Sequence, residues 1–145
     1  MRNARSWAEA EFGHAELGDV RRTARLVGLA AEVARRPAGT VLKACGTSAS
    51  REGAFRLLEN DAVHPGAVRN AMEHAAVLKC AAAKHVFVAL DGTSLSLTDN
   101  VRSKGLGGVG AWDRGARGVQ VMTALALEQG GSALGVCGQR MWTRN

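Results

Sequence analysis

Three arginines stand close together near the start of this sequence, at a spacing that suits the binding of an anion. Arg21, Arg22 and Arg25 follow Asp19, a residue type that caps helices by accepting hydrogen bonds from the first amides. In a helix that begins after Asp19, the three side chains are neighbours at spacings of three and four residues. A helix N-terminus already carries positive partial charge, so cations gathered there indicate a ligand such as phosphate. The alternative is a solvated face on which the arginines pair with nearby acids, namely Glu16, Asp19 or Glu32.

A second basic segment runs from Gly46 to Arg56 and is rich in glycine, serine and threonine. A turn of this composition that leads into a helix offers amides and hydroxyl groups to a phosphate, and its arginines add charge. The plainer alternative is a capped helix on the surface. Besides the three arginines above, the predicted DNA-binding residues are Lys43, Thr47, Arg51 and Arg56.

Asp91 is the residue best placed for metal chemistry. It directly follows the apolar run Val86–Leu90, and an acid at the end of a core strand is costly unless it is paired, hydrogen-bonded or bound to a metal. A turn formed with Gly92 is the alternative. The histidines and cysteines show no spacing typical of metal ligands.

The elements that must position these residues change in character near residue 85. The first half has helical spacing, with helices predicted over about 20–36, from Thr47 to about Asn60, and from Pro65 onward. Asp19, Thr47 and Pro65 are residue types that favour helix starts. We expect these helices to close a core formed by Leu26, Leu29, Val33, Phe55, Leu58, Val68 and Met72.

The second half has the pattern of strands and turns. Val86–Leu90 predicts a strand buried on both faces, and the alternating residues 93–97 follow it. After a glycine-rich loop over 99–118, strands are predicted over 119–127, where a helix is also permitted, and over 134–143, with a hairpin turn at Gly130–Gly131 between them. Such a three-strand meander has no covering helix, so we expect self-association through 119–127 and 134–136, and first proteolytic cleavage within 99–118.

The composition excludes several classes of protein. The chain has 145 residues, 19 Lys and Arg against 13 Asp and Glu, and 46% hydrophobic residues, which is usage typical of a globular protein. No apolar run approaches the roughly 18 residues of a membrane helix, and no signal peptide is visible. Three widely spaced cysteines suit a reducing compartment. We therefore expect a cytoplasmic protein that is neither secreted nor bound to a membrane.

Three segments resemble bacterial cut-and-paste transposases and occur in the family's order. The sequence is similar to the N-terminal third of the insertion-sequence-four family of DDE transposases, and above all to its transposon-five-type members, from Trp7 to the end of the chain. The segments are Ala15-Glu-Leu-Gly-Asp-Val-Arg-Arg-Thr-Ala-Arg-Leu26, Glu52-Gly-Ala-Phe-Arg-Leu-Leu-Glu-Asn60 and Leu90-Asp-Gly-Thr-Ser-Leu-Ser96.

The resemblance implies an α+β fold with two domains. Residues 1–84 would form a helical domain that binds transposon ends in double-stranded DNA, and 85–145 the first strands of an incomplete ribonuclease-H-like catalytic domain. Arg21, Arg22 and Arg25 match positions that contact DNA or adjoin such positions, and Asp91 matches the first catalytic carboxylate. The family's reaction is two-metal phosphodiester hydrolysis with Mg²⁺ or Mn²⁺, for which Asp91 would be a metal ligand.

The chain departs from the family in its length. Family members are several times longer and carry the second Asp and the Glu beyond the third strand. A single carboxylate cannot hold two metal ions, so we expect a truncated, DNA-binding transposase fragment without catalysis by itself. Its further partners would be a copy of itself or a full-length transposase. The rival hypothesis is a small helical interaction or regulatory protein without specific DNA binding.

Overall fold

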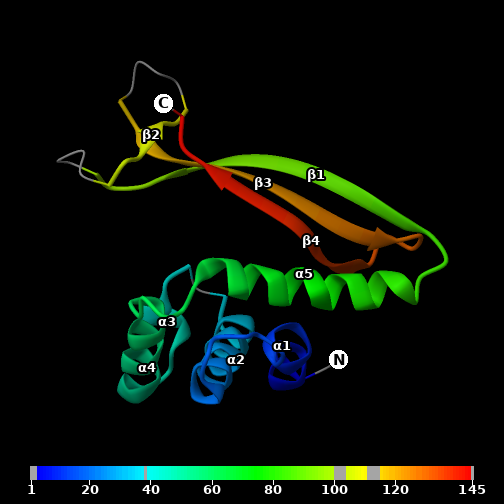
Figure 1. Ribbon diagram of the computed structural model, residues 1–145, viewed down its shortest axis with the longest axis horizontal. Coiled ribbons are helices and arrows are strands. Elements are labelled where there is room, and N and C mark those ends of the chain that lie inside the picture. The colour runs from blue at the N-terminus through cyan, green and yellow to red at the C-terminus, as the bar shows by residue number, and fades with distance from the viewer. Residues whose placement is uncertain (1–2, 38, 100–103, 111–114, 145) are drawn as a thin grey trace. The chain divides into compact units, whose positions relative to one another are not determined.

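The computed structural model describes residues 3–37, 39–99, 104–110 and 115–144. The chain forms two compact units, Met1–Leu78 and Lys79–Asn145. The first unit is helical and the second is an antiparallel sheet, so the predicted α+β class is confirmed (Figure 1). Part of the predicted loop over 99–118 lies outside the described residues, namely 100–103 and 111–114. No helix in the described part of the chain is both long and apolar enough to cross a membrane.

The predicted helices form where their capping residues place them. The helices are α1 (Ala4–Phe12), α2 (Val20–Arg35), α3 (Val41–Ala44), α4 (Ser48–Leu58) and α5 (Pro65–Ala81), whose last residues belong to the second unit. The Asp19 side chain accepts a hydrogen bond of 2.8 Å from the backbone N of Arg21. Thr47 and Ser50 form a capping box, in which each side chain accepts a bond from the other residue's backbone N.

The helices α1 and α3 are absent from the sequence prediction. Asn3 caps α1 by accepting a hydrogen bond of 2.7 Å from the backbone N of Arg5. Thr40 caps α3, which is a single turn of four residues. Neither segment is long enough to show an apolar stripe at helical spacing, so the cap residues are the only local signal for them.

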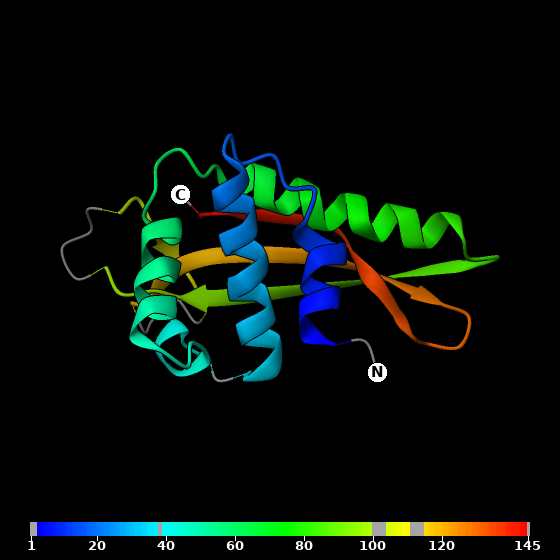
Figure 2. The same ribbon diagram turned by 90° about the horizontal axis from the view of Figure 1, so that it is seen from below.

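α2 lies between α1 and α4, and the three helices alternate in direction (Figure 2). On one side of α2, Val27 and Ala31 pack with Ala8 of α1. The rings of Trp7 and Phe12 meet edge to face, with centroids 6.2 Å apart. The larger cluster joins α2 to α4 and α5, and its buried members are Ala15, Leu17, Leu26, Leu57 and Ala71.

The predicted core is right for part of its residues. Leu26 is buried, and Leu29 and Val68 pack against the larger cluster. The prediction is wrong for three others, since the exposed fractions are 43% for Val33, 39% for Phe55 and 60% for Leu58. On α4 the buried positions are Ala54 and Leu57, one step of about 100° around the helix from the pair that was predicted.

The sheet unit is a meander with one additional short strand. Its strands are β1 (Val86–Ser96), β2 (Gly107–Gly108), β3 (Arg117–Glu128) and β4 (Ala133–Trp142). β3 is central: β1 pairs along one side of it, and β4 and the two-residue β2 pair along the other (Figure 1). The predicted turn at Gly130–Gly131 joins β3 to β4, and Gly131 has a φ of 80°, a conformation that favours glycine.

β1 differs from its prediction in burial. Its apolar sequence predicts a strand buried on both faces, but every one of its 11 residues is exposed. The physical reason is its position at the edge of a sheet, where β3 is the only strand that pairs with it in the described part of the chain. The strand also continues through Asp91 and Gly92 to Ser96, so the alternative of a turn at Asp91 is wrong.

Beyond β1, the buried carboxylate of Asp99 contacts residues from both ends of the following segment. The Asp99 side chain is fully buried and lies 3.7 Å from the Arg117 guanidinium, measured from Oδ2 to Nε. The backbone N of Lys104 donates to both Asp99 oxygens, at 3.3 and 3.4 Å. Arg117 in turn donates to the carbonyl oxygen of Leu106. We call these contacts the Asp99 clamp, because they hold the two ends of the segment 99–117 together.

Candidate nucleic-acid interface

Four of the predicted DNA-binding arginines line one hollow of the helical unit. Because α2 and α4 are antiparallel, the beginning of α2 lies beside the end of α4 (Figure 2). Arg21, Arg22 and Arg25 come from the start of α2, and Arg56 comes from the last turn of α4. The hollow has a volume of about 230 Å³, and Leu57 and Asn60 complete its lining. We call it the arginine hollow.

The four arginines are held to different degrees. Arg22 is half-buried, and its Nη1 donates a hydrogen bond of 2.9 Å to the carbonyl oxygen of Leu17. Arg56 forms an ion pair with Glu52 on the same helix, while 70% of its side chain stays exposed. Arg21 and Arg25 are exposed, and neither forms an ion pair with an acid in the part of the chain that the structure describes. Their free guanidinium groups are therefore available to an incoming anion.

Among the described residues, none of the three arginines at the start of α2 forms an ion pair with Glu16, Asp19 or Glu32, the acids that the alternative of a solvated face names. The Asp19 carboxylate caps the helix by accepting from a backbone amide, and Glu32 pairs with Arg35 at 3.2 Å. Arginines elsewhere in the unit do pair with acids, as Arg5 does with Glu9 and Arg69 with Glu73. Arg21, Arg22 and Arg25 therefore differ from the paired arginines of the unit, which include Arg35 at the other end of α2.

Arg25 owes its position to a glycine of the neighbouring helix. A Cβ placed on Gly53 of α4 would lie 3.4 Å from Nη1 of Arg25, so the guanidinium rests against the bare backbone at this point. Arg25 also lines a second, adjacent hollow of about 200 Å³ together with Cys45, Ser50 and Ala54. The side chain thus extends along the groove between α2 and α4.

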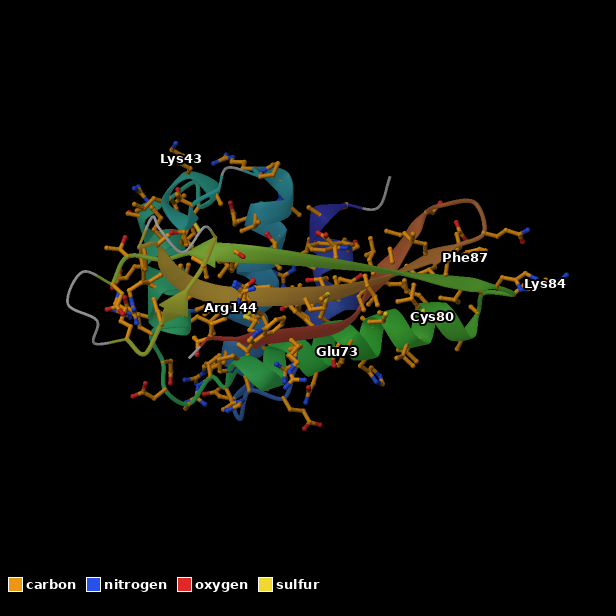
Figure 3. All side chains as sticks on the ribbon, turned by 90° about the horizontal axis from the view of Figure 1, so that it is seen from above. Lys43, Glu73, Cys80, Lys84, Phe87 and Arg144 are labelled. Atoms are coloured by element: carbon orange, nitrogen blue, oxygen red, sulfur yellow. The ribbon has the colours of Figure 1, made fainter. Side chains whose placement is uncertain are left out.

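The remaining predicted residues lie at the other end of α4. Lys43 is exposed on α3 and points away from the helices (Figure 3). Arg51 donates from Nε to the carbonyl oxygen of Thr47 at 3.3 Å. The Thr47 hydroxyl serves the capping box, so in this structure it stabilises the helix. These three residues are not part of the lining of the arginine hollow.

Two polar residues of these surfaces were missed by sequence reasoning. Asn60 lines the arginine hollow. Its Oδ1 accepts a hydrogen bond of 3.0 Å from the backbone N of Ala62. Arg36 lies over Gly46, where an added Cβ would stand 2.6 Å from its Nη1. The signal for Asn60 is its position just past the end of a helix, and for Arg36 it is the glycine that leaves room for the guanidinium.

Asp91 lies in the middle of β1, opposite Thr123 of β3, and is exposed. In the part of the chain that the structure describes, no group of three or more His, Cys, Asp or Glu side chains is placed to hold a metal ion. A lone exposed carboxylate does not fit a centre that binds two Mg²⁺ or Mn²⁺ ions. We therefore derive no chemical step through a metal at Asp91.

The helical unit has a counterpart among known protein families. Residues 4–63 match the model of a family described as transposase DNA-binding. The matched segment spans α1 to α4 and includes all seven predicted DNA-binding residues. This match supports a transposase DNA-binding domain in the helical unit, with DNA as its partner. The sheet unit lies outside the matched residues.

Proposed function

We propose that the chain binds the duplex DNA of transposon ends through the arginine hollow. The observation that carries this proposal is the convergence of Arg21, Arg22, Arg25 and Arg56 on one hollow, whose described lining residues include no carboxylate. Arginine guanidinium groups match phosphate oxygens in geometry and charge. Contacts of this kind fix the position of a protein on DNA, while the affinity they supply is nearly independent of sequence.

The test removes the three arginines at the start of α2 together. Replacing Arg21, Arg22 and Arg25 with Ala should weaken binding to duplex DNA, measured by fluorescence anisotropy over a salt series. Each neutralised phosphate contributes about 0.9 to the slope of log affinity against log salt, so three lost contacts should reduce that slope by about 2.7.

A matched variant has the same change in net charge. Arg5, Arg35 and Arg69 each pair with an acid of the same unit, so their joint replacement by Ala also removes three positive charges. We expect this control to keep an affinity and a salt slope close to those of the parent chain. Equal losses in both triple variants would mean that the chain attracts DNA by net charge alone. Unchanged binding in the α2 variant would favour an interaction protein without specific DNA binding.

We further propose that the protein belongs to the cut-and-paste transposition machinery of the insertion-sequence-four type and acts in the cytoplasm. The order of its segments supports this, since the match to the transposase DNA-binding family is followed by a sheet carrying Asp91. In this proposal the sheet unit corresponds to the first strands of a ribonuclease-H-like domain, with Asp91 as its first carboxylate. A full-length transposase that shares the same DNA ends is a further partner.

This chain should not cleave DNA by itself. One carboxylate cannot position two metal ions on a phosphodiester, so purified protein with Mg²⁺ or Mn²⁺ should leave supercoiled plasmid intact. Nicking that disappears in Asp91→Ala would contradict the proposal and would mean that other acids complete a site. Nicking that persists in Asp91→Ala would point to a contaminating nuclease.

A further inference from the structure

The helical unit has a further hollow, which holds two histidines. It has a volume of about 440 Å³ and lies between α5 and the segment that joins α1 to α2. The polar residues of its lining are His14 and Glu16 from that segment and Asn70 and His74 from α5. None of these residues lines the arginine hollow, so the proposed DNA contact does not use them. We call this surface the histidine hollow.

The rings of His14 and His74 meet in this hollow. Their centroids are 4.9 Å apart, and their planes are inclined by 58°. The two residues are 60 positions apart in the sequence, and both are exposed. Their spacing along the chain therefore gives no sign of a shared site, whereas the packing of the segment before α2 against α5 brings the rings together.

One hydrogen bond determines which nitrogen of His14 is available to a ligand. Its Nε2 lies 2.9 Å from the backbone carbonyl oxygen of Ala71. Because a carbonyl oxygen only accepts, Nε2 is the nitrogen that donates, and Nδ1 of the neutral ring holds a lone pair. Histidines that bind metals in proteins are commonly held in this way, with the second ring nitrogen donating to a carbonyl oxygen or a carboxylate. His14 is thus oriented as metal-binding histidines are.

The distance between the two rings fits two imidazoles on one metal ion. A Zn–N bond measures about 2.0–2.1 Å, and a ring nitrogen lies about 1.1 Å from the ring centroid. Two rings on one ion would therefore have centroids about 4.5 Å apart at an N–Zn–N angle of about 90°, and about 5.1 Å apart at the tetrahedral angle. The observed 4.9 Å lies between these values. The rings have the separation that a shared metal ion requires.

The rest of the lining favours a cation. Glu16 contributes a carboxylate, and the described lining contains no Lys or Arg, although the net charge of the chain is +6. Asn70 lies one helical turn before His74 on the same face of α5, so its amide oxygen is a third donor near the rings. No third His, Cys, Asp or Glu is placed with the pair in the described residues. The remaining ligands would be the Asn70 oxygen and water.

We propose that His14 and His74 bind a divalent transition metal ion of the zinc class. Imidazole nitrogen suits Zn²⁺ and Ni²⁺, whereas Mg²⁺ prefers oxygen ligands and should not compete. Two histidines with water in the open positions make a weaker site than the four protein ligands of a structural zinc centre. The ion joins the segment before α2 to α5, so its binding stabilises the helical unit.

Zinc titration of the full chain tests the proposal. Isothermal titration calorimetry of the reduced protein in excess Mg²⁺ should show one zinc ion bound per chain. His14→Gln keeps an N–H that can donate to Ala71 but has no ring lone pair, so it should bind zinc at least about 10-fold more weakly. His74→Gln should show a similar loss. Zinc should raise the Tm of the parent chain and leave the Tm of both variants almost unchanged.

His64→Gln is the matched control. His64 does not line the hollow, and its Nδ1 accepts a hydrogen bond of 3.1 Å from the backbone N of Gly66. This variant should bind zinc as the parent chain does, and an equal loss in it would overturn the proposal. Absence of zinc binding by the parent would also overturn it. Binding that persists in both hollow variants would do the same, and would place zinc on the cysteines or elsewhere.

Ring nitrogen chemical shifts decide the question if a hollow variant fails to fold. In the parent chain, zinc should shift the ¹⁵N resonances of His14 and His74, with the largest change at Nδ1 of His14. The resonances of His64 and His85 should stay in place. Shifts confined to His64 or His85 would overturn the proposal, because zinc would then bind outside the histidine hollow.

Discussion

The two units of this chain bury their apolar residues to very different extents. In the helical unit, Ala8, Val27 and Ala31 have exposed fractions of 1% or less, because helices pack against helices on both sides of α2. In the sheet unit, β1 carries Val, Phe and Leu side chains in solvent along its whole length. The sequences of α2 and β1 are both rich in apolar residues. The difference lies in the partners that the described chain supplies.

An apolar run in the sequence therefore predicts whether a segment is a helix or a strand better than it predicts whether that segment is buried. A helical stripe can be buried by another helix of the same small unit, as Leu26 is by residues of α4 and α5. A strand needs neighbours at its edges and a layer over its face, and its own sequence supplies neither.

Leucine truncation should separate the two units most clearly. Leu26 is 8% exposed in the larger helical cluster, so Leu26→Ala should lower the free energy of unfolding of the helical unit by about 3 kcal/mol. Leu90 is 71% exposed, and Leu90→Ala should change stability by less than about 0.5 kcal/mol. Urea unfolding followed by circular dichroism measures both. Similar losses in the two variants would show that β1 is covered in solution.

Replacement of Asp99 and replacement of Asp91 should likewise differ in their effect on the stability of the sheet unit. The Asp99 side chain is fully buried against Arg117, so Asp99→Ala leaves that guanidinium without its carboxylate and should cost about 2 kcal/mol. Exposed Asp91 is the control, and Asp91→Ala should have little effect on stability. Limited proteolysis provides the readout, because cleavage within 99–118 should accelerate in the Asp99 variant alone. Equal cleavage rates would mean that the Asp99 clamp does not hold this segment.

Thr47 allows capping to be distinguished from DNA contact. Thr47→Ala removes the cap of α4 and should destabilise the helical unit by about 1 kcal/mol. Thr47→Asp restores a capping oxygen but adds a negative charge, so it should recover stability and bind DNA more weakly than the parent. Thermal unfolding and anisotropy on the same samples compare the two effects. If Thr47→Asp binds as tightly as the parent chain, Thr47 lies outside the DNA interface.

Replacement of Glu52 should have the smallest effect on stability and on DNA affinity. Glu52 pairs with Arg56 on the exposed surface of α4, a type of contact worth about 0.3–0.5 kcal/mol. Glu52→Gln should therefore leave stability almost unchanged and raise DNA affinity slightly, because Arg56 is released and a negative charge next to the arginine hollow is lost. Glu9→Gln removes the same charge at the Arg5 pair, away from the hollow. An equal gain in both variants would reflect net charge only.

The sequence predicts local features of the helical unit well. Asp19, Thr47 and Pro65 mark the starts of α2, α4 and α5, because capping and proline placement depend on neighbouring residues alone. It fails where the outcome depends on another element. Phe55 and Leu58 have the spacing of a buried face, but α4 presents Ala54 and Leu57 to the core, a choice made by the surfaces that pack against it.

In the candidate site too, the sequence predicts local features but not those that depend on packing between helices. The arginines of α2 are conspicuous in the sequence, whereas their convergence with Arg56 depends on the antiparallel packing of α2 and α4, which no single segment encodes. The proximity of Arg25 to Gly53 likewise joins residues 28 positions apart. Asp91 remains a prediction as a first carboxylate, because its described surroundings contain no set of ligands.

The Asp99 clamp has a consequence for how the chain tolerates changes in length. Asp99 and Arg117 bring the ends of the intervening segment together through their own contacts, independently of how many residues lie between them. The entropy lost on closing a loop rises only with the logarithm of its length, about 0.6 kcal/mol for each doubling. Peptide inserted between residues 110 and 115, beyond Leu106 and β2, should therefore leave the pairing of β1 with β3 intact. This makes the segment a suitable place for an epitope or a fluorescent label with which to follow the protein on DNA.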